Sequence, residues 1–330
     1  MYRLRFVLIL FLFSCAQLSM QAQRHRRERE SISKPKTNPC FDASDATEIR
    51  LWQSPAPGAV GDDSCRDVPY VQVFQPVDPS RKVHPAILVI PGGGYDNLAD
   101  KREQASVAEY FVTQLHVTAF VLRYRLVQSD GTYRYPIPLW DGQRAVRLLR
   151  ARSHDLGIDP SHIALLGFSA GGHLASTLAL HPSASFGATA TDAIDTGSAQ
   201  VNLLGLGYPV ISMNPEAVPP SGSYKHLLMG FHGNKLKELQ HYLSGEENVT
   251  PIIPPVFLFE SMDDQKISPQ NSILFADALR REHVTAEVHL FRHGEHGSGL
   301  SVGIPDEDVW PSLFNDWIER QWPGFRPYRR

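Results

Sequence analysis

Apolar residues in the body of the chain gather into short runs that alternate with longer segments of helical periodicity. Near-continuous apolar runs such as 86–90 indicate strands that are buried on both faces. Strands separated by helices predict right-handed βαβ units around a mostly parallel sheet, and hence an α/β protein. The expected strands are 70–74, 86–90, 119–123, 163–167, 203–208, 256–260 and 287–291, and the expected helices are 101–115, 141–154, 172–180, 270–282 and 310–322.

Residues 1–22 carry a different pattern, in which arginines precede the apolar run 6–13 and a mixed polar stretch follows. This order is typical of a secretory signal peptide. Glutamines and serines interrupt the run before it reaches the roughly 20 apolar residues that a membrane-spanning helix needs. We therefore expect an exported protein, periplasmic or secreted, that is cleaved near Ala22 and has no stable membrane span. An alternative is a lipid anchor at Cys15, since the preceding residues resemble a lipoprotein box.

Residues 23–67 are interpreted as a linker or a loosely docked N-terminal arm. The basic run 24–29, read as a solvated tail, gives way to Ser, Thr, Pro and Gly with little apolar periodicity. We expect the main globular domain at 68–322 and a C-terminal tail at 323–330.

Composition narrows the class of protein. A net charge of −3, with 42% hydrophobic and 20% charged residues, is ordinary for a globular protein. No basic block runs through the body of the chain, so nucleic acid is not an expected partner. Apart from Cys15, only Cys40 and Cys65 are present. They can form one disulfide in an oxidising compartment or remain free thiols, and their number and spacing exclude a cysteine metal site.

The strongest chemical signal is Gly167-Phe168-Ser169-Ala170-Gly171, which matches G-x-S-x-G. It lies between a predicted strand and a predicted helix, the context in which this motif holds a serine at a strained turn. A serine hydroxyl is a weak nucleophile at neutral pH and needs a base within hydrogen-bond reach. The motif predicts Ser169 as a nucleophile.

A glycine-rich segment, Pro91-Gly92-Gly93-Gly94-Tyr95, directly follows the strand 86–90. Glycines let backbone N–H groups approach a substrate oxygen closely. We predict an oxyanion hole formed by the N–H groups of Gly93, Gly94 and Ala170. The spacing of a nucleotide-binding loop is absent from this segment.

The acid and histidine that such a serine requires lie in two later loops. The segment after the strand 256–260 offers Asp263 and Asp264, and the segment after the strand 287–291 offers His293 and His296. Both loops belong at the carboxyl edge of a parallel sheet, where active sites form. A metal site at the two histidines is disfavoured because glycines separate them and no third ligand is evident. We expect no metal and no cofactor.

Several segments together resemble the α/β-hydrolase esterases of the acetyl xylan esterase and bacterial feruloyl esterase type, which are related to the hormone-sensitive-lipase-like group. The resemblance covers about 68–322. It is carried by PGGGY at 91–95, YPIPLWDGQRAVRLLR at 135–150, GFSAGGH at 167–173, GYPVISM at 207–213, ENVTPIIPPVFLFESMDD at 247–264 and HGEHGSGL at 293–300.

The resemblance implies an α/β-hydrolase fold and selects Asp264 and His296, so the expected catalytic triad is Ser169, Asp264 and His296. Tyr95, beside the oxyanion glycines, and Trp140 are candidates for substrate contact, although a core position for Trp140 is an equal alternative. Glu260-Ser261 departs from the His-Thr or His-Ala of relatives, which leaves substrate choice open.

The implied activity is hydrolysis of short-chain acyl esters, chiefly acetyl, on carbohydrates such as acetylated xylan. One alternative is a general carboxylesterase or lipase for small or lipid esters. Another, of a different class, is a noncatalytic exported protein that binds carbohydrate. The sequence leaves the oligomeric state open.

Overall fold

The computed structural model describes residues 40–77, 82–99 and 101–323. The chain divides into two units, 1–37 and 38–330, and the second contains every described residue. The predicted signal peptide, the alternative lipid anchor at Cys15 and the basic run 24–29 lie outside the described residues, as does the tail from 324. Within the described ranges, no helix is long and apolar enough to cross a membrane.

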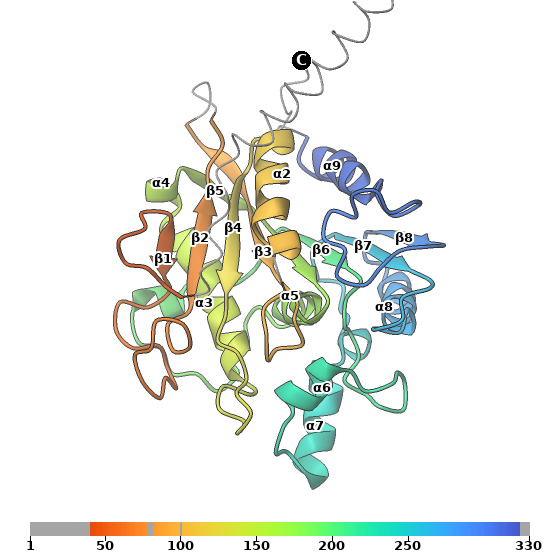
Figure 1. The fold of residues 1–330 in the computed structure, drawn as a ribbon, viewed down its shortest axis with the longest axis horizontal. Coiled ribbons are helices and arrows are strands. Elements are labelled where there is room, and N and C mark those ends of the chain that lie inside the picture. The colour runs from red at the N-terminus through yellow and green to blue at the C-terminus, as the bar shows by residue number, and fades with distance from the viewer. Residues whose placement is uncertain (1–39, 78–81, 100, 324–330) are drawn as a thin grey trace, which may run out of the picture. The chain divides into compact units, whose positions relative to one another are not determined.

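One eight-stranded sheet forms the centre of the described domain (Figure 1). The strand order is β1-β2-β4-β3-β5-β6-β7-β8, and all neighbouring pairs from β4 to β8 are parallel, whereas β2 is antiparallel to both of its neighbours. The expected α/β-hydrolase fold with a mostly parallel sheet is confirmed. The strands are β1 (Glu48–Arg50), β2 (Tyr70–Phe74), β3 (His84–Ile90), β4 (Thr118–Arg123), β5 (Ile158–Phe168), β6 (Leu203–Gly207), β7 (Val256–Ser261) and β8 (Ala286–Phe291).

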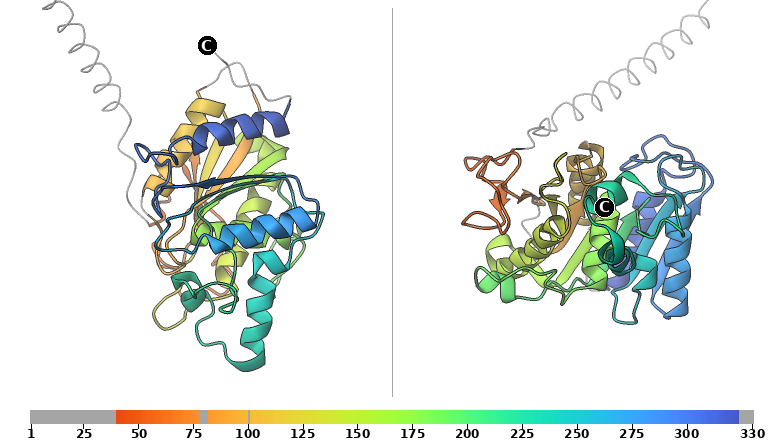
Figure 2. Two further views of the ribbon diagram at one scale, coloured as in Figure 1. Left: turned by 90° about the vertical axis from the view of Figure 1, so that its right-hand side faces the viewer. Right: turned by 90° about the horizontal axis from the view of Figure 1, so that it is seen from below.

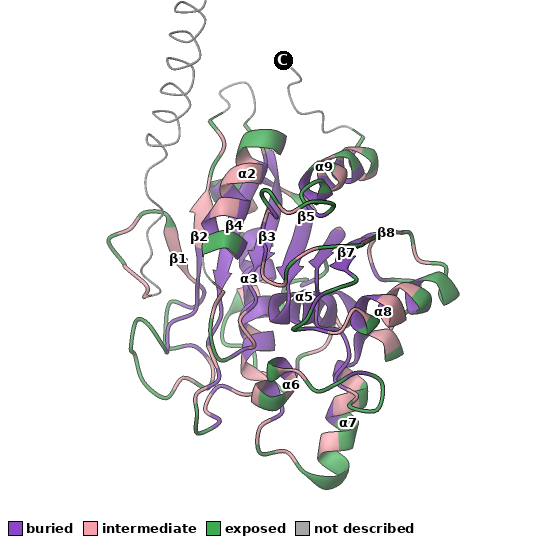
Figure 3. Cartoon of the chain, turned by 45° about the vertical axis from the view of Figure 1, so that its right-hand side comes forward, coloured by how far each residue is buried: buried purple, intermediate pink, exposed green. Residues whose placement is uncertain are grey.

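Helices cover both faces of the sheet (Figure 2). Successive side chains of a strand point to opposite faces, so Leu88 of β3 joins one apolar cluster and Val89 joins the other. Both faces of the central strands are therefore buried, as Figure 3 shows in purple. The first cluster packs against α3 (Ile137–Ala151), α5 (Ala170–Leu180) and α8 (Gln270–Arg281), and the second packs against α2 (Ala105–Leu115) and α9 (Trp310–Gln321).

Several short elements have no counterpart among the predicted ones. Two of them, α6 (Gly222–Leu227) and α7 (Gly233–Leu243), fall between β6 and β7 and lie close to each other in Figure 1. The first has only six residues, and the second buries only Leu239 and Leu243, so neither carries the apolar periodicity that predicts a helix. The others are β1, η2 (Ala193–Thr196) and η3 (Gly245–Glu247). In contrast, η1 (Lys101–Glu103) lies within the predicted helix 101–115, and α4 (Ser153–Leu156) overlaps the end of the predicted helix 141–154.

The described part of the predicted arm, 40–67, is not loosely docked. Its strand β1 pairs antiparallel with β2, and its Leu51 and Trp52 are buried in the core. A disulfide joins Cys40 to Cys65. The predicted domain start at residue 68 is therefore too late, because an edge strand and buried apolar side chains before it belong to the same core.

Candidate active site

Ser169 lies at the turn between β5 and α5 with a backbone φ of 52°. This conformation is strained for a residue with a side chain. The turn is so tight that a Cβ atom at Gly167 would lie 2.4 Å from the Gly171 carbonyl oxygen, and one at Gly171 would lie 2.1 Å from the carbonyl oxygen of Ile90. The two glycines of the motif are thus required by close backbone approach.

The structure brings Ser169, His296 and Asp264 together. The Ser169 Oγ lies 2.8 Å from His296 Nε2, and His296 Nδ1 lies 2.7 Å from Asp264 Oδ2. Asp264 follows β7 and His296 follows β8, so three strand ends meet at one edge of the sheet. The arrangement orients a base toward the serine and a carboxylate toward the base, as nucleophilic catalysis requires.

Asp264 is held as a carboxylate. Burial by itself would raise its pKa, but the hydrogen bond and charge of His296 and the N–H groups of Ile267 and Lys266 lower the pKa below its ordinary value. The two N–H groups reach Oδ1 at 3.0 and 2.7 Å, which leaves Oδ2 for His296. The backbone of this loop therefore sets the direction of the carboxylate.

The neighbouring candidates, Asp263 and His293, pair with each other instead. Their Oδ2 and Nδ1 atoms are 2.9 Å apart, and their side chains are 44% and 52% exposed. The structure thus assigns one acid and histidine pair to the serine and the other to the surface.

Two of the three predicted oxyanion residues, Gly93 and Gly94, border the same cleft as Ser169 and His296. Gly93 and Gly94 have φ of 111° and 68°, and a Cβ atom at Gly93 would lie 2.3 Å from the Asn97 carbonyl oxygen. Both glycines line a cleft of about 450 Å³, and Ala170 begins α5 behind the serine. Among the described residues, no hydrogen bond occupies the N–H groups of Gly93, Gly94 or Ala170. They are available to a substrate oxygen.

Two predicted substrate contacts lie elsewhere. Tyr95 is fully buried, and its hydroxyl lies 2.7 Å from His173 Nδ1. Trp140 is half-buried against the core, and its Nε1 donates to the Phe186 carbonyl oxygen at 3.0 Å. Neither residue lines the cleft. The substrate role is therefore wrong for Tyr95, and Trp140 takes the core position that was its alternative.

The BD-FAE family model matches residues 71–279. The chain belongs to the BD-FAE family. Endo-1,4-beta-xylanase B of Butyrivibrio fibrisolvens is 32% identical over 225 residues, which cover 64% of this chain and 32% of that protein. An acetylxylan esterase of Xylanibacter ruminicola is 28% identical over 248 residues, covering 74% of this chain and 47% of that protein. The chain therefore spans less than half the length of these BD-FAE-like relatives.

A solved structure resembles this BD-FAE chain over nearly its whole domain. The acetyl ester-xyloside bifunctional hydrolase of Caldicellulosiruptor lactoaceticus aligns with a TM-score of 0.73 and 35% identity, covering 85% of this chain and 97% of that one. The described domain therefore has the α/β-hydrolase fold.

Glu103 is a member of the cleft that no sequence motif marks. It lies in η1, is 2% exposed, and lines the cleft beside Ser169 and His296. In the sequence it stands in a charged stretch that reads as the exposed start of a helix. The remaining lining residues are mostly polar: Asp96, Asn97, Ala99, Arg102, Gly222, Ser223, Lys266, Ile267 and Gly297.

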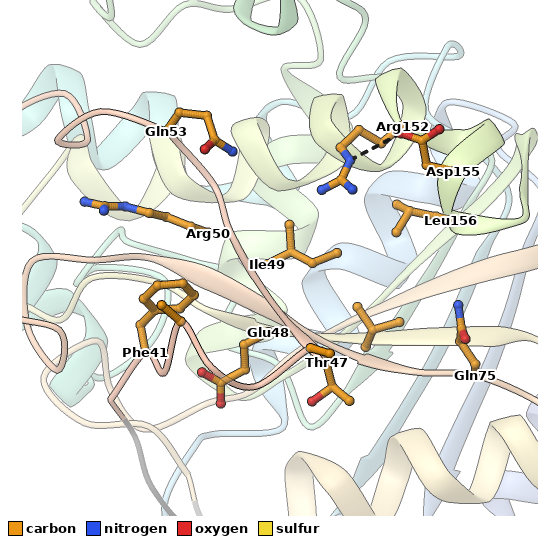
Figure 4. A pocket seen from close by; sticks show the side chains of 13 residues that line it. Phe41, Thr47, Glu48, Ile49, Arg50, Gln53, Gln75, Arg152, Asp155 and Leu156 are labelled. Carbon is orange, nitrogen blue, oxygen red and sulfur yellow. Dashed lines mark ion pairs between the residues drawn. The ribbon is translucent and has the colours of Figure 1, made fainter.

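A larger pocket, of about 690 Å³, lies at the β1 edge of the sheet, beside α4 (Figure 4). Phe41, Ile49 and Leu156 contribute its apolar surface, and Arg152 and Asp155 form an ion pair at 3.8 Å on its rim. Neither Ser169 nor His296 borders it. Size alone therefore does not identify the reactive cleft. In the described ranges no group of three or more His, Cys, Asp or Glu side chains is placed to hold a metal ion.

Proposed function

We propose that this protein hydrolyses short-chain acyl esters, chiefly acetyl esters, of carbohydrates such as acetylated xylan. The observation that carries the proposal is the chain of hydrogen bonds from Ser169 through His296 to Asp264. It lies beside the Gly93 and Gly94 N–H groups, which donate no hydrogen bond within the described part of the chain. The names of two similar proteins, an acetylxylan esterase and an acetyl ester-xyloside hydrolase, support the substrate class.

In the proposed mechanism Ser169 Oγ attacks the ester carbonyl carbon while His296 Nε2 takes the hydroxyl proton. The carbonyl oxygen becomes an oxyanion, which the N–H groups of Gly93, Gly94 and Ala170 stabilise, aided by the positive end of the α5 dipole. Asp264 stabilises the imidazolium and fixes the tautomer of His296. His296 then gives its proton to the departing sugar oxygen, and an acyl group remains on Ser169.

Deacylation repeats these steps with water. His296 takes a proton from a water molecule, whose oxygen attacks the acyl carbon, and the tetrahedral intermediate collapses to release the acid and restore the Ser169 hydroxyl. Asn97, Arg102 and Lys266 in the lining of the cleft offer polar groups that a sugar could meet.

The test is a serine variant assayed on esters of increasing length. We expect Ser169→Ala, folded by circular dichroism, to lose on the order of 10⁴-fold or more in kcat on p-nitrophenyl acetate. We expect the wild type to react with a fluorophosphonate, to release acetate from acetylated xylan, and to lose kcat/KM steadily from acetyl to octanoyl esters.

Three results would contradict the proposal. Activity of Ser169→Ala within tenfold of the wild type would overturn the nucleophile. A preference for octanoyl or longer esters would favour a lipase. No reaction of the wild type with the fluorophosphonate would favour a noncatalytic carbohydrate-binding protein.

We also propose that the protein is exported. The pattern of residues 1–22 and the Cys40–Cys65 disulfide support this location, since disulfides persist in oxidising compartments. Fractionation of producing cells tests it, and the mass of the mature protein separates cleavage near Ala22 from lipid attachment at Cys15.

A further inference from the structure

Glu103 connects two parts of the proposed site. Its Oε2 accepts a hydrogen bond from the Gly92 N–H at 2.7 Å, and its Oε1 accepts one from the Tyr208 hydroxyl at 3.0 Å. Gly92 precedes the oxyanion glycines, and Tyr208 follows the end of β6. One buried carboxylate therefore joins the loops that follow two different strands.

Tyr208 extends this connection to the loop that carries His296. Its hydroxyl accepts a hydrogen bond from the Gly299 N–H at 2.9 Å. Its ring lies edge-on to the His296 imidazole, with 5.0 Å between ring centroids and 62° between ring planes. Tyr208 is 2% exposed, so these contacts are shielded from water. Glu103, Tyr208 and Gly299 thus form a bridge from the oxyanion loop to the histidine loop.

The Gly92 end of the bridge lies against the nucleophile. A Cβ atom at Gly92 would be 2.7 Å from Ser169 Cβ and 2.9 Å from Glu103 Oε2, so its backbone fits between the two side chains. The adjoining Pro91 carbonyl oxygen accepts a hydrogen bond from the Tyr124 hydroxyl at 2.9 Å. This hydrogen bond and the one from the Gly92 N–H to Glu103 hold the peptide group that joins Pro91 to Gly92. The next peptide group is held by the Ala99 N–H, which donates to the Gly92 carbonyl oxygen at 2.9 Å, and this group carries the Gly93 N–H.

Burying a carboxylate costs free energy unless hydrogen bonds replace its hydration. Glu103 is not part of the proposed triad of Ser169, His296 and Asp264, so its burial in this cleft needs another explanation. We propose that Glu103 is a positioning residue, which fixes the oxyanion loop and the histidine loop relative to each other through Gly92 and Tyr208. This inference rests on the proposed function, because it assigns Glu103 a role in that mechanism.

Replacement by alanine and by glutamine separates positioning from charge. Glu103→Ala removes the bridge, and we expect kcat on p-nitrophenyl acetate to fall about 10- to 100-fold while KM changes less than about threefold, since small displacements of reacting groups act on the transition state. Glutamine can accept from the Gly92 N–H with its oxygen and donate to the Tyr208 oxygen with its nitrogen. We expect Glu103→Gln to recover kcat to within about fivefold of the wild type.

A double-mutant cycle tests whether Glu103 and Tyr208 act as one unit. We expect Glu103→Ala with Tyr208→Phe to lose little more kcat than Glu103→Ala alone, because both changes break the same bridge. Tyr110→Phe is the matched control: it removes the hydroxyl that accepts from Asn315 at 3.2 Å, away from the cleft, and kcat should stay within twofold of the wild type, as is typical for a remote site.

The proposal is overturned if folded Glu103→Ala keeps kcat within twofold of an active wild type, if glutamine is as damaging as alanine, or if the losses in the cycle add. Should Glu103→Ala not fold, Glu103→Gln and Tyr208→Phe decide the question, with near-normal kcat expected for the first and a loss for the second. An inactive wild type that also fails to react with the fluorophosphonate would instead contradict the proposed function.

Discussion

Two adjacent aspartates acquire different roles through their surroundings. The Asp264 side chain is 1% exposed and is held by two backbone N–H groups and His296. The Asp263 side chain is 44% exposed and pairs with His293. Solvent screens an exposed pair of this kind, so it contributes little to stability. Direction and burial, rather than residue type, distinguish the two carboxylates.

This difference predicts the effects of two matched substitutions. We expect Asp264→Asn to lower kcat by about 10⁴-fold, because an amide no longer fixes the tautomer of His296. We expect Asp263→Asn to change kcat by less than about threefold, as surface changes usually do. Steady-state kinetics on p-nitrophenyl acetate compares the two variants. A larger loss of kcat for Asp263→Asn would show that the acid is Asp263 and not Asp264.

At the scale of elements, the loops after β7 and β8 are fastened by buried carboxyl groups behind the site. Glu307, which precedes α9, accepts hydrogen bonds from the hydroxyls of Ser261, Ser298 and Ser301. These serines stand at the end of β7 and in the histidine loop. The carboxylate therefore ties the segment around His296 to the sheet edge.

Glu260 joins β7 to α8. Its Oε2 accepts a hydrogen bond from Ser272 Oγ at 3.0 Å, and its Oε1 accepts from the Ser261 N–H at 2.9 Å. Burial raises the pKa of Glu260 to about 8, and the nearby Asp264 charge acts in the same direction, while the two hydrogen bonds oppose it. Glu260 is therefore protonated in the folded protein at neutral pH.

The raised pKa of Glu260 makes the stability of the fold depend on pH. Between the ordinary pKa of 4.5 and about 8, the folded state holds a proton that the unfolded state has released, so the free energy of unfolding falls as pH rises, by up to about 1.4 kcal/mol per pH unit. Glu260→Gln mimics the protonated acid. We expect the free energy of unfolding, measured with urea, to increase for the variant relative to the wild type from pH 5 to pH 8. A difference that stays constant over this range would contradict the raised pKa of Glu260.

At the scale of the molecule, residues 40–67 complete the core of the described domain. The guanidinium groups of Arg125 and Arg144 lie 5.8 and 5.2 Å from the centroid of the Trp52 ring. Arg125 is paired with Asp141 at 2.6 Å, and Arg144 donates to the Leu51 carbonyl oxygen at 2.7 Å. Two arginines of the main domain therefore hold the preceding segment by its ring and its backbone.

Removing this ring should weaken the fold without altering the chemistry. We expect Trp52→Ala to lower the free energy of unfolding by about 3–5 kcal/mol, the usual cost of deleting a buried aromatic side chain. Gln53→Ala, at the exposed next position, should change it by less than about 0.5 kcal/mol. Urea unfolding measures both, and kcat per folded molecule should stay unchanged. Equal effects for the two variants would mean that the segment is loosely attached after all.

The sequence by itself determined the features that depend on local pattern. Buried parallel strands need continuous apolar runs, so the runs at 86–90 and 256–260 predicted β3 and β7 closely. The turn at Ser169 needs small neighbours on both sides, so Gly167 and Gly171 marked it without any knowledge of distant contacts. For the strands and for Gly167 the physical cause lies within a few residues of the effect, whereas Gly171 must also admit the backbone of Ile90 in β3.

Tertiary structure decided which distant side chains meet. His296 is 127 positions from Ser169, and the sequence around it could only be matched to relatives, since the direction of a loop side chain depends on everything packed behind the loop. The same reason explains why Tyr95 points into the core rather than the cleft and why Glu103, in a stretch that reads as solvent-exposed, is buried beside the nucleophile. It also explains the docking of residues 40–67, because a three-residue edge strand and one tryptophan are too short a pattern to predict a contact that only the assembled sheet provides.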